Sequence, residues 1–306
     1  MTFKQLQAVY WVVQLGGFAQ AANKLHTTQS AVSKRIHELE VQFNIPLFDR
    51  SLRTARLTEK GEEMFAVAKR LLAERDQAVD QFVRPETLER RLRLGVTEVT
   101  AITWLPRLVG RIQDFYPKVI IEPDMDTGVG LRDKILAGDL DLAILGGAIE
   151  DERFTRCPVG TLSLAWMCKP GLIDTSKTVP LHELAKHPLI LQGEKSSTGE
   201  VVDSWIGAMG IRLHKSVAIN NMLAMIGMAV SGLGITCLPA QCLQAMVDSG
   251  RLEVIPVKPA LPGVTYVAMY RSERHSTLIT SIARLARECC DFSRMFQIEE
   301  LAPEKP

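Results

Sequence analysis

The stretch that decides the fold runs from residue 18 to residue 57 and reads FAQAANKLHTTQSAVSKRIHELEVQFNIPLFDRSLRTARL. Apolar residues recur at helical spacing in two short segments, which are Phe18, Ala21, Ala22 and Leu25, then Val32, Ile36 and Leu39. The connection from His26 to Thr28 is short enough for a tight turn only, and Thr28 has the hydroxyl that an N-cap needs. We therefore predict a helix-turn-helix.

The second of these helices has a polar outer face. If Val32, Ile36 and Leu39 face inward, the N-terminal half of the helix points polar and basic side chains outward. A recognition helix inserts this half into the major groove, where Gln pairs with adenine, Ser reaches base edges or phosphate, and Lys and Arg supply positive charge. The predicted DNA-binding residues of this helix are Thr28, Gln29, Ser30, Ser33, Lys34 and Arg35.

A short β hairpin, or wing, is predicted after the second helix. Residues 51–55 form its tip, and Arg50 and Arg53 lie along it in positions that suit the phosphate backbone or the minor groove. The alternative is a small three-helix domain with ordinary surface charge. Capping, burial pattern and charge agree with one another, which favours the DNA-binding interpretation.

Two further helices flank the stretch. Residues 3–15 form a supporting helix that ends at Gly16. Thr58 caps a long helix that runs to about Val83, with an apolar stripe that needs a partner. A second copy of the helix is the expected partner, and packing on its own domains is the alternative. The segment 86–91 after Pro85 is the predicted hinge.

The charge is distributed unevenly along the 306 residues. The whole chain has a formal net charge of +1, but residues 1–56 hold seven Lys and Arg against three Asp and Glu. The remaining 250 residues therefore carry an excess of three acidic residues. The concentration of positive charge in the N-terminal part agrees with a DNA partner for that part.

From Leu92 onward, short apolar runs alternate with helical stretches, which is typical of βαβ units and a parallel sheet. The predicted strands are 92–96, 119–122, 140–145, 162–168, 188–191, 216–219, 234–238 and 263–270. The predicted helices are 102–115, 131–137, 200–209, 222–230 and 276–292. Crossovers near Gly160 and Gly263 predict two α/β lobes with a cleft between them.

The N-terminal stretch resembles LysR-type transcriptional regulators from about Phe3 to Gly61 without a gap. The resemblance is carried by Ala21-Ala22, Leu25, Thr28 to Ser33, Ile36, Leu39-Glu40, Leu47 to Arg50, Leu57-Thr58 and Gly61. Ser30 stands where the family often has proline. Looser matches at Asp139 to Ile144 and at Ser231 to Pro239 agree with the family's effector domain, which resembles periplasmic binding proteins.

The resemblance implies an α+β multidomain protein in three parts. These are a winged helix-turn-helix domain at 1–58, a linker or dimerisation helix with its hinge at 59–88, and an effector-binding domain at 89–306. Within the last part we expect lobe I at 89–161 and 263–306, and lobe II at 162–262.

Loops after the predicted strands are expected to line the cleft. Hydroxyls and backbone amides at helix starts suit an anion, although any single loop here is equally well explained as a capped helix. The predicted effector-binding residues are Thr97, Glu98, Thr100, Ala101, Thr127, Gly128, Gly146, Ser196, Ser197, Thr198 and Asn221. Many relatives sense small organic acids, but Glu98 would repel an anion and these loops hold no arginine. The effector therefore stays unnamed.

Other classes of protein lack support in the sequence. There is no G-x-G-x-x-G after the strand at 92–96, no phosphate-binding P-loop and no G-x-S-x-G, so we expect no enzyme. His182 and His187 are five apart, whereas zinc-binding helices place histidines four apart. The uncharged segment 216–247 is interrupted by Gly and Pro, which disfavours a membrane span.

The six cysteines have no C-x-x-C spacing and no secretory leader precedes them. Buried thiols in a reducing cytoplasm are the expectation, and a redox switch is the alternative.

The sequence thus predicts a cytoplasmic, bacterial LysR-type regulator without a bound cofactor. Its expected partners are double-stranded DNA with an interrupted palindrome, further copies of itself as a homodimer or a dimer of dimers (a homotetramer), RNA polymerase, and a small-molecule effector. The competing hypothesis is a two-lobed solute-binding or ligand-processing protein whose N-terminal helices only mediate assembly.

Overall fold

The computed structural model describes residues 1–49, 55–80, 85–147, 151–193, 195–211, 215–272 and 276–297. The chain divides into two compact units, Met1–Phe82 and Val83–Pro306.

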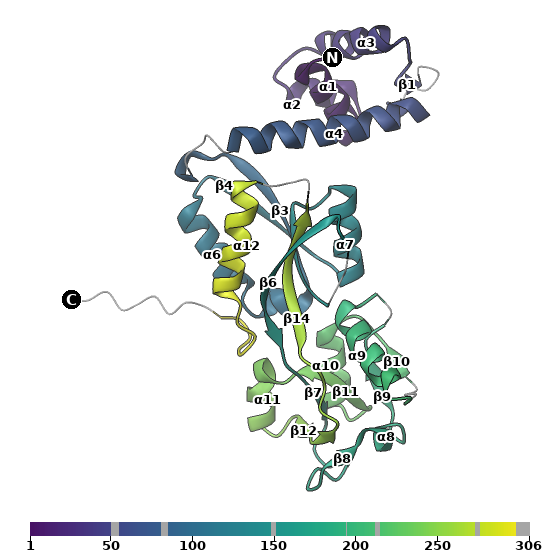
Figure 1. Cartoon of the computed structure of the whole chain (residues 1–306), viewed down its shortest axis with the longest axis vertical. Helices are drawn as coiled ribbons and strands as arrows, with labels where there is room; N and C mark the ends of the chain where they lie inside the picture. The colour runs from purple at the N-terminus through teal and green to yellow at the C-terminus, as the bar shows by residue number, and fades with distance from the viewer. Residues whose placement is uncertain are drawn as a thin grey trace, which may run out of the picture. The chain divides into compact units, whose positions relative to one another are not determined.

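The first unit begins with three helices around one small core (Figure 1). These are α1 (Phe3–Gln14), α2 (Phe18–Lys24) and α3 (Gln29–Phe43). Val32, Ile36 and Leu39 of α3 are buried as predicted. The Thr28 hydroxyl accepts a hydrogen bond from the N–H of Ala31 at 3.2 Å, which caps α3, and Asn44 ends the helix in the left-handed conformation. The predicted helix-turn-helix is confirmed.

A two-stranded wing follows α3. Strand β1 (Phe48–Asp49) pairs antiparallel with β2 (Arg56–Leu57), while the wing tip with Arg50 and Arg53 lies outside the described residues. Glu40, near the end of α3, is buried and accepts hydrogen bonds from the N–H groups of Leu47 and Phe48 at 2.8 and 3.3 Å. Its carboxylate therefore fixes the wing to α3.

Helix α4 (Glu59–Asp80) starts where the sequence predicts, while the predicted end near Val83 lies outside the described residues. Helix α1 covers the first half of its apolar stripe, because Leu6 forms a buried cluster with Ala68 and Leu72. Farther along, the side chain of Val79 is 52% exposed. The unit's own packing thus accounts for the first half of the stripe.

The second unit contains two five-stranded sheets. The first sheet has the order β4-β3-β5-β14-β6, in which β3 is parallel to β4 and β5, and β14 is antiparallel to β5 and β6. Its strands are β3 (Arg90–Val96), β4 (Val119–Met125), β5 (Leu142–Gly146), β6 (Phe154–Leu162) and β14 (Val264–Arg271). Its helices are α5 (Glu98–Ile102), α6 (Leu105–Phe115), α7 (Gly128–Ala137) and α12 (Thr277–Cys289).

The second sheet has the order β10-β9-β11-β7-β12 and is also mixed, since β7 runs antiparallel to β11 and β12. Its strands are β7 (Leu164–Cys168), β9 (Leu189–Leu191), β10 (Lys215–Ala218), β11 (Ile235–Pro239) and β12 (Glu253–Ile255). Its helices are α8 (Leu181–Leu184), α9 (Ser197–Ala208), α10 (Met222–Val230) and α11 (Gln244–Asp248). The small pair β8 (Val179–Pro180) and β13 (Val257–Lys258) and the 3₁₀ turns η1 (Pro85–Thr87) and η2 (Gln241–Leu243) complete the unit.

The predicted fold class of an N-terminal helix-turn-helix and two C-terminal α/β lobes is confirmed, with two corrections in the sheets. The sheets are mixed rather than parallel, because β14 runs antiparallel to its neighbours in the first sheet and β7 does so in the second. The single strand predicted at 162–168 is the junction of two strands, β6 in one sheet and β7 in the other.

Candidate functional site

The outer face of α3 presents the polar side chains that the sequence predicts. Gln29, Ser30, Ser33 and Lys34 are exposed, and the side chain of Lys34 is 78% exposed with its ammonium 4.0 Å from the carboxylate of Glu38. Arg35 is half-buried. The outer face of α3 therefore offers amide, hydroxyl and ammonium groups to solvent.

Part of this polar face is already hydrogen bonded within the helix start. The Thr28 hydroxyl lies 3.0 Å from the Ser30 hydroxyl and also caps the helix through Ala31. Thr28 and Ser30 thus stabilise the start of α3, while Gln29, Ser33 and Lys34 extend into solvent.

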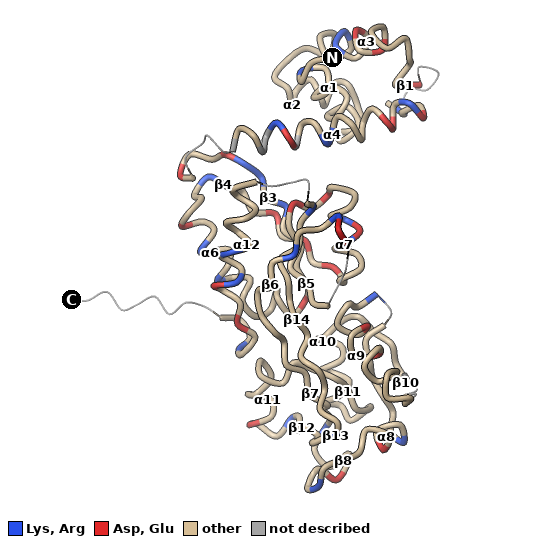
Figure 2. Tube along the Cα trace, in the orientation of Figure 1, with Lys and Arg blue, Asp and Glu red and all other residues tan. Residues whose placement is uncertain are grey.

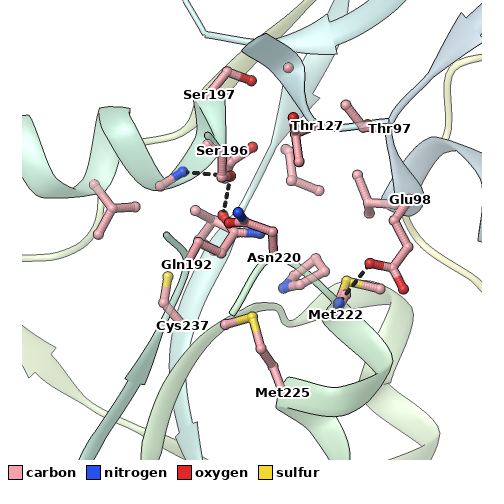
Figure 3. Close-up of a pocket in the computed structure, with 18 of the residues that line it drawn as sticks. Thr97, Glu98, Thr127, Gln192, Ser196, Ser197, Asn220, Met222, Met225 and Cys237 are labelled. Carbon is pink, nitrogen blue, oxygen red and sulfur yellow. Dashed lines mark hydrogen bonds between the residues drawn. The ribbon is translucent and has the colours of Figure 1, made fainter. Parts of the chain in front are cut away.

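The second unit contains a cavity of about 220 Å³ lined by residues from both sheets and their helices (Figure 3). Four helices begin at it, and each follows the carboxyl end of a strand: α5 after β3, α7 after β4, α9 after β9 and α10 after β10. Ligands of open α/β sheets bind at this end of the strands. The arrangement follows from the strand order rather than from any single motif.

Side chains cap three of these helices at the pocket. The Thr127 hydroxyl accepts from the N–H of Gly130 at 3.3 Å, the Ser196 hydroxyl from Gly199 at 3.1 Å, and the Asn221 amide oxygen from Ala224 at 2.7 Å. The Ser196 hydroxyl in turn donates to the amide oxygen of Gln192 at 2.7 Å. The predicted loop residues Thr127, Ser196 and Asn221 therefore cap helices in addition to lining the cavity.

Glu98, at the start of α5, contacts the start of α10. Its carboxylate accepts a hydrogen bond from the N–H of Met222 at 2.6 Å and from that of Leu223 at 3.4 Å (Figure 3). These are the first two amides of α10, which packs on the second sheet, whereas α5 follows a strand of the first. Glu98 thus links the two lobes.

Acidic side chains also occur elsewhere on the wall. Asp126 accepts from the N–H of Thr127 at 2.7 Å and lies 2.9 Å from the ammonium of Lys134. Burial raises the pKa of Asp126, but the hydrogen bonds from Lys134 and Thr127 lower it by more, so the carboxyl stays ionised at neutral pH. Asp203 of α9 is the third acidic lining residue.

Gln192, Gly199 and Asn220 also line the cavity. Apolar residues form the rest of the lining, and sequence reasoning missed most of them. They are Val99, Met125, Leu162, Leu164, Leu191, Val202, Met222, Met225, Cys237, Leu238, Pro239 and Tyr266. Tyr266 is buried, and its hydroxyl accepts from Thr97 at 3.3 Å. Burial raises the pKa of Tyr266. The predicted crossovers near Gly160 and Gly263 could have indicated part of this apolar lining, since Leu162, Leu164 and Tyr266 lie beside them.

The cavity brings together most of the residues predicted for effector binding. Those that line it are Thr97, Glu98, Thr127, Gly128, Ser196, Ser197, Thr198 and Asn221. Thr100, Ala101 and Gly146 lie outside the lining. Thr100 is buried beneath Thr97, with the two hydroxyl oxygens 3.4 Å apart, and a Cβ at Gly146 would collide with the ring of Tyr266.

Metal and membrane sites receive no support from the described part of the chain. No group of three or more His, Cys, Asp and Glu side chains within it is arranged to hold a metal ion, and the imidazole of His182 lies 3.4 Å from the carboxylate of the neighbouring Glu183. No helix within it is long and apolar enough to cross a membrane, and Figure 2 shows α10 and β11 without charged residues as parts of the folded lobe.

The described cysteines are free thiols. Burial raises the pKa of Cys237 to about 12, and burial followed by the charge of Glu253 raises that of Cys168 to about 12. Burial likewise raises the pKa of Cys242 to about 11 and is the main cause that raises that of Cys290 to about 12. These thiols are protonated at neutral pH, which disfavours a redox role for them.

Comparison with known proteins adds independent evidence. Residues 3–62 match the model for bacterial regulatory helix-turn-helix proteins of the lysR family, and residues 85–291 match that for the LysR substrate binding domain. A probable RuBisCO transcriptional regulator of Cyanidium caldarium is 26% identical over 297 residues, covering 93% of this chain and 94% of the relative.

Solved structures share the fold over most of their length. A full-length OxyR variant of Pseudomonas aeruginosa has a TM-score of 0.72 at 21% identity, covering 98% of this chain and 99% of that one. CbnR in complex with its target DNA has a TM-score of 0.59 at 18% identity, covering 95% and 100%. The regulatory domain of Synechocystis CcmR in complex with 2-PG has a TM-score of 0.59 at 16% identity, covering 66% and 98%.

The two family models together account for both units of the chain, and both describe parts of a regulator rather than an enzyme. The chain belongs to the LysR family of DNA-binding transcriptional regulators, with an N-terminal helix-turn-helix and a C-terminal effector-binding domain.

Proposed function

We propose that this LysR-type regulator binds an interrupted palindrome near a promoter through α3 of paired subunits, and that a small molecule in the interlobe pocket controls this binding. The observation that carries the proposal is the conjunction of an exposed polar face on α3 with a cavity at the starts of four helices. The first suits the major groove, and the second suits a small ligand.

Individual residues of α3 have different proposed roles. Gln29, Ser33 and Lys34 read base edges, because they are exposed in the N-terminal half of the helix. Arg35 holds phosphate, and so do Arg50 and Arg53, which lie outside the described residues. The solved complex of CbnR with its target DNA supports a DNA partner for this chain.

The proposed effector is a small organic molecule. The complex of the CcmR regulatory domain with 2-PG supports this class of ligand. The contact set proposed for this chain consists of the eight sequence-predicted residues that line the cavity, with the apolar residues of the crossover strands below them. A ligand changes the regulator only through its different affinity for two arrangements of the subunits.

Assembly and location are further parts of the proposal. The exposed Val79 near the end of α4 suits pairing with a second subunit, and two such dimers form a tetramer. The functional parts are residues 1–58, 59–88 and 89–306, with lobe I at 89–161 and 263–306 and lobe II at 162–262. The protein acts in the cytoplasm, where it contacts RNA polymerase at the promoter.

The test is binding of the full-length protein to the DNA upstream of its own gene, with scrambled DNA as competitor, at about 50 and about 200 mM salt. The proposal expects saturable binding that survives the competitor and weakens at the higher salt. Binding no tighter than to scrambled DNA, by a folded dimer with and without cell-extract metabolites, would contradict it.

A matched pair of lysine variants separates α3 from the general charge of the protein. Lys34 and Lys118 are both exposed and both lie beside a glutamate, but Lys118 belongs to the second unit. Lys34→Ala should lower the preference for cognate over scrambled DNA, because Lys34 is proposed to read a base edge, whereas Lys118→Ala should leave the preference unchanged.

A further inference from the structure

The start of α10 is an anion position that the chain itself fills. The first two amides of this helix, those of Met222 and Leu223, donate to Glu98, and the third, that of Ala224, donates to the side chain of Asn221. The amide of Met225 makes the first regular intrahelical bond, to the backbone carbonyl of Asn221. The first three amides of α10, which have no intrahelical partner, are therefore all occupied.

A carboxylate is the group that such a position favours. The helix macrodipole places partial positive charge at its N-terminus, and amide donors there bind anions. Glu98 lies 124 positions from Met222 along the chain and belongs to the opposite lobe, so the contact is formed only by the fold. In Figure 3 its carboxylate points at α10 from the side of Thr97 and Thr127, on the rim of the cavity.

The charge on the wall of the cavity has the same sign as Glu98. Glu98, Asp126 and Asp203 are lining residues, and no Lys, Arg or His is among the lining residues that the structure describes. The ammonium of Lys134, which pairs with Asp126, also lies 2.8 Å from the carboxylate of Asp124. Lys134 does not itself line the cavity. An anionic ligand would therefore meet three carboxylates, of which Asp126 is paired with Lys134, and no cationic side chain among the described lining residues.

We propose that Glu98 takes the place of an anionic effector group at the start of α10, so that the pocket selects a small polar molecule without a negative charge. This proposal rests on the proposed role of the cavity as the effector site. Hydroxyls of Thr97, Thr127 and Ser197 and the amide of Gln192 supply the hydrogen bonds such a molecule needs, and the apolar crossover strands bury its carbon skeleton.

The proposal predicts that a free carboxylate replaces Glu98 once the side chain is removed. The experiment measures the thermal unfolding of full-length wild type and Glu98→Ala in sodium acetate, against acetamide plus sodium chloride at equal ionic strength. Loss of the two charged hydrogen bonds should lower the melting temperature of Glu98→Ala by about 2–5 °C. Acetate should then raise the melting temperature of Glu98→Ala by about 2 °C more than acetamide does.

The control variant is Glu200→Ala. Glu200 is also an acidic residue in the first turn of a pocket helix, α9, but it is exposed and lies outside the lining. Acetate and acetamide should act alike on Glu200→Ala and on wild type, which removes general salt effects from the comparison.

Two results would overturn the proposal. If acetate stabilises Glu98→Ala no more than acetamide does, the start of α10 is not an anion position held by Glu98. If acetate stabilises wild type over acetamide as strongly as it stabilises Glu98→Ala, the pocket accepts an anion with Glu98 in place. Neither result depends on DNA binding, so failure here is distinguishable from failure of the regulator proposal.

Discussion

Helix α3 and the interlobe pocket present polar side chains in two different ways. The residues proposed to read base edges, Gln29, Ser33 and Lys34, come from six consecutive positions of one helix, 29–34, and are exposed on its outer face. The pocket lining comes from segments between Thr97 and Tyr266 that belong to both sheets. The α3 surface depends on the residue pattern and capping of a single helix, whereas the pocket depends on the order of strands that are distant in sequence. Different substitutions should therefore impair the two sites.

The largest loss of stability is expected at Gly61, which packs tightly in the first unit. A Cβ at Gly61 would collide with the backbone carbonyl of Leu47, next to the wing. Gly61→Ala should therefore destabilise the first unit by about 3 kcal/mol and abolish DNA binding. Hydrogen exchange of the helices α1 to α4, measured with DNA affinity, tests this.

Gly110→Ala is the matched control for Gly61→Ala. Gly110 lies within helix α6 and has open space where a Cβ would stand, so this variant should be neutral or slightly stabilised. Equal DNA affinity of Gly61→Ala and Gly110→Ala would break the comparison, because the first unit would then tolerate a packing change that its geometry forbids.

The next effect concerns the link from α3 to the wing. Glu40→Ala leaves the buried amides of Leu47 and Phe48 without the carboxylate, which should cost about 2 kcal/mol of stability in the first unit. Glu38→Ala, an exposed glutamate two positions earlier, should change stability by less than about 0.5 kcal/mol. Denaturant unfolding followed by circular dichroism measures both, and similar values for the two variants would contradict the role of Glu40.

Sequence discrimination is expected to change without a change in stability. Gln29→Ala should lose about 1.5 kcal/mol of preference for cognate over scrambled DNA, since one bidentate contact to a base disappears. Competition binding with the two DNAs measures the preference. Equal losses on both DNAs would show that Gln29 contacts the backbone rather than a base.

The pocket should respond more weakly to loss of a single cap. Ser196→Ala removes the hydrogen bonds to Gly199 and Gln192 and should cost about 1 kcal/mol, while DNA binding without effector stays unchanged. Ser249→Ala, an exposed serine at the end of α11, should cost less than about 0.5 kcal/mol. Altered DNA affinity of Ser196→Ala in effector-free protein would show that the pocket and α3 are coupled even without ligand.

The last prediction concerns the reactivity of Cys237 in the pocket, which should leave DNA binding unchanged. Burial raises its pKa from 9.0 to about 12, so at a given pH below 9 its thiolate fraction should be about a thousandfold below that of an unperturbed thiol. Iodoacetamide at pH 8, with peptide mass mapping against free cysteine, should modify it correspondingly slowly. Modification at the rate of free cysteine would reopen the redox alternative.

Elements that depend on local sequence, such as α10, could be predicted, whereas elements that depend on distant neighbours, such as β6, could not. Helix α10 has the predicted bounds because an apolar run, Met222–Val230, lies between Asn221 and Gly232. Strand β6 was not predicted, because Pro158 and Gly160 interrupt its pattern. It tolerates Pro158 as an edge strand with a single neighbour, β14, and nothing local in the sequence reveals an edge position.

The pocket was predicted in part for a related reason. Loops that begin helices are visible in sequence through caps such as Thr127 and Ser196, and both line the cavity. The lining residues Leu164, Cys237 and Tyr266 were missed, because they come from strands whose neighbours are distant in sequence. The contact of Glu98 with α10 likewise needs both lobes to be folded.

The most direct test of the account is selection of DNA from the organism's own fragmented genome by the full-length protein, with Gln29→Ala in parallel. Sequencing of the bound fragments should yield a common interrupted palindrome with wild type and a clear loss of its enrichment with Gln29→Ala. Recovery of fragments without a common sequence by folded wild-type protein, with and without cell-extract metabolites, would contradict the claim that α3 reads DNA.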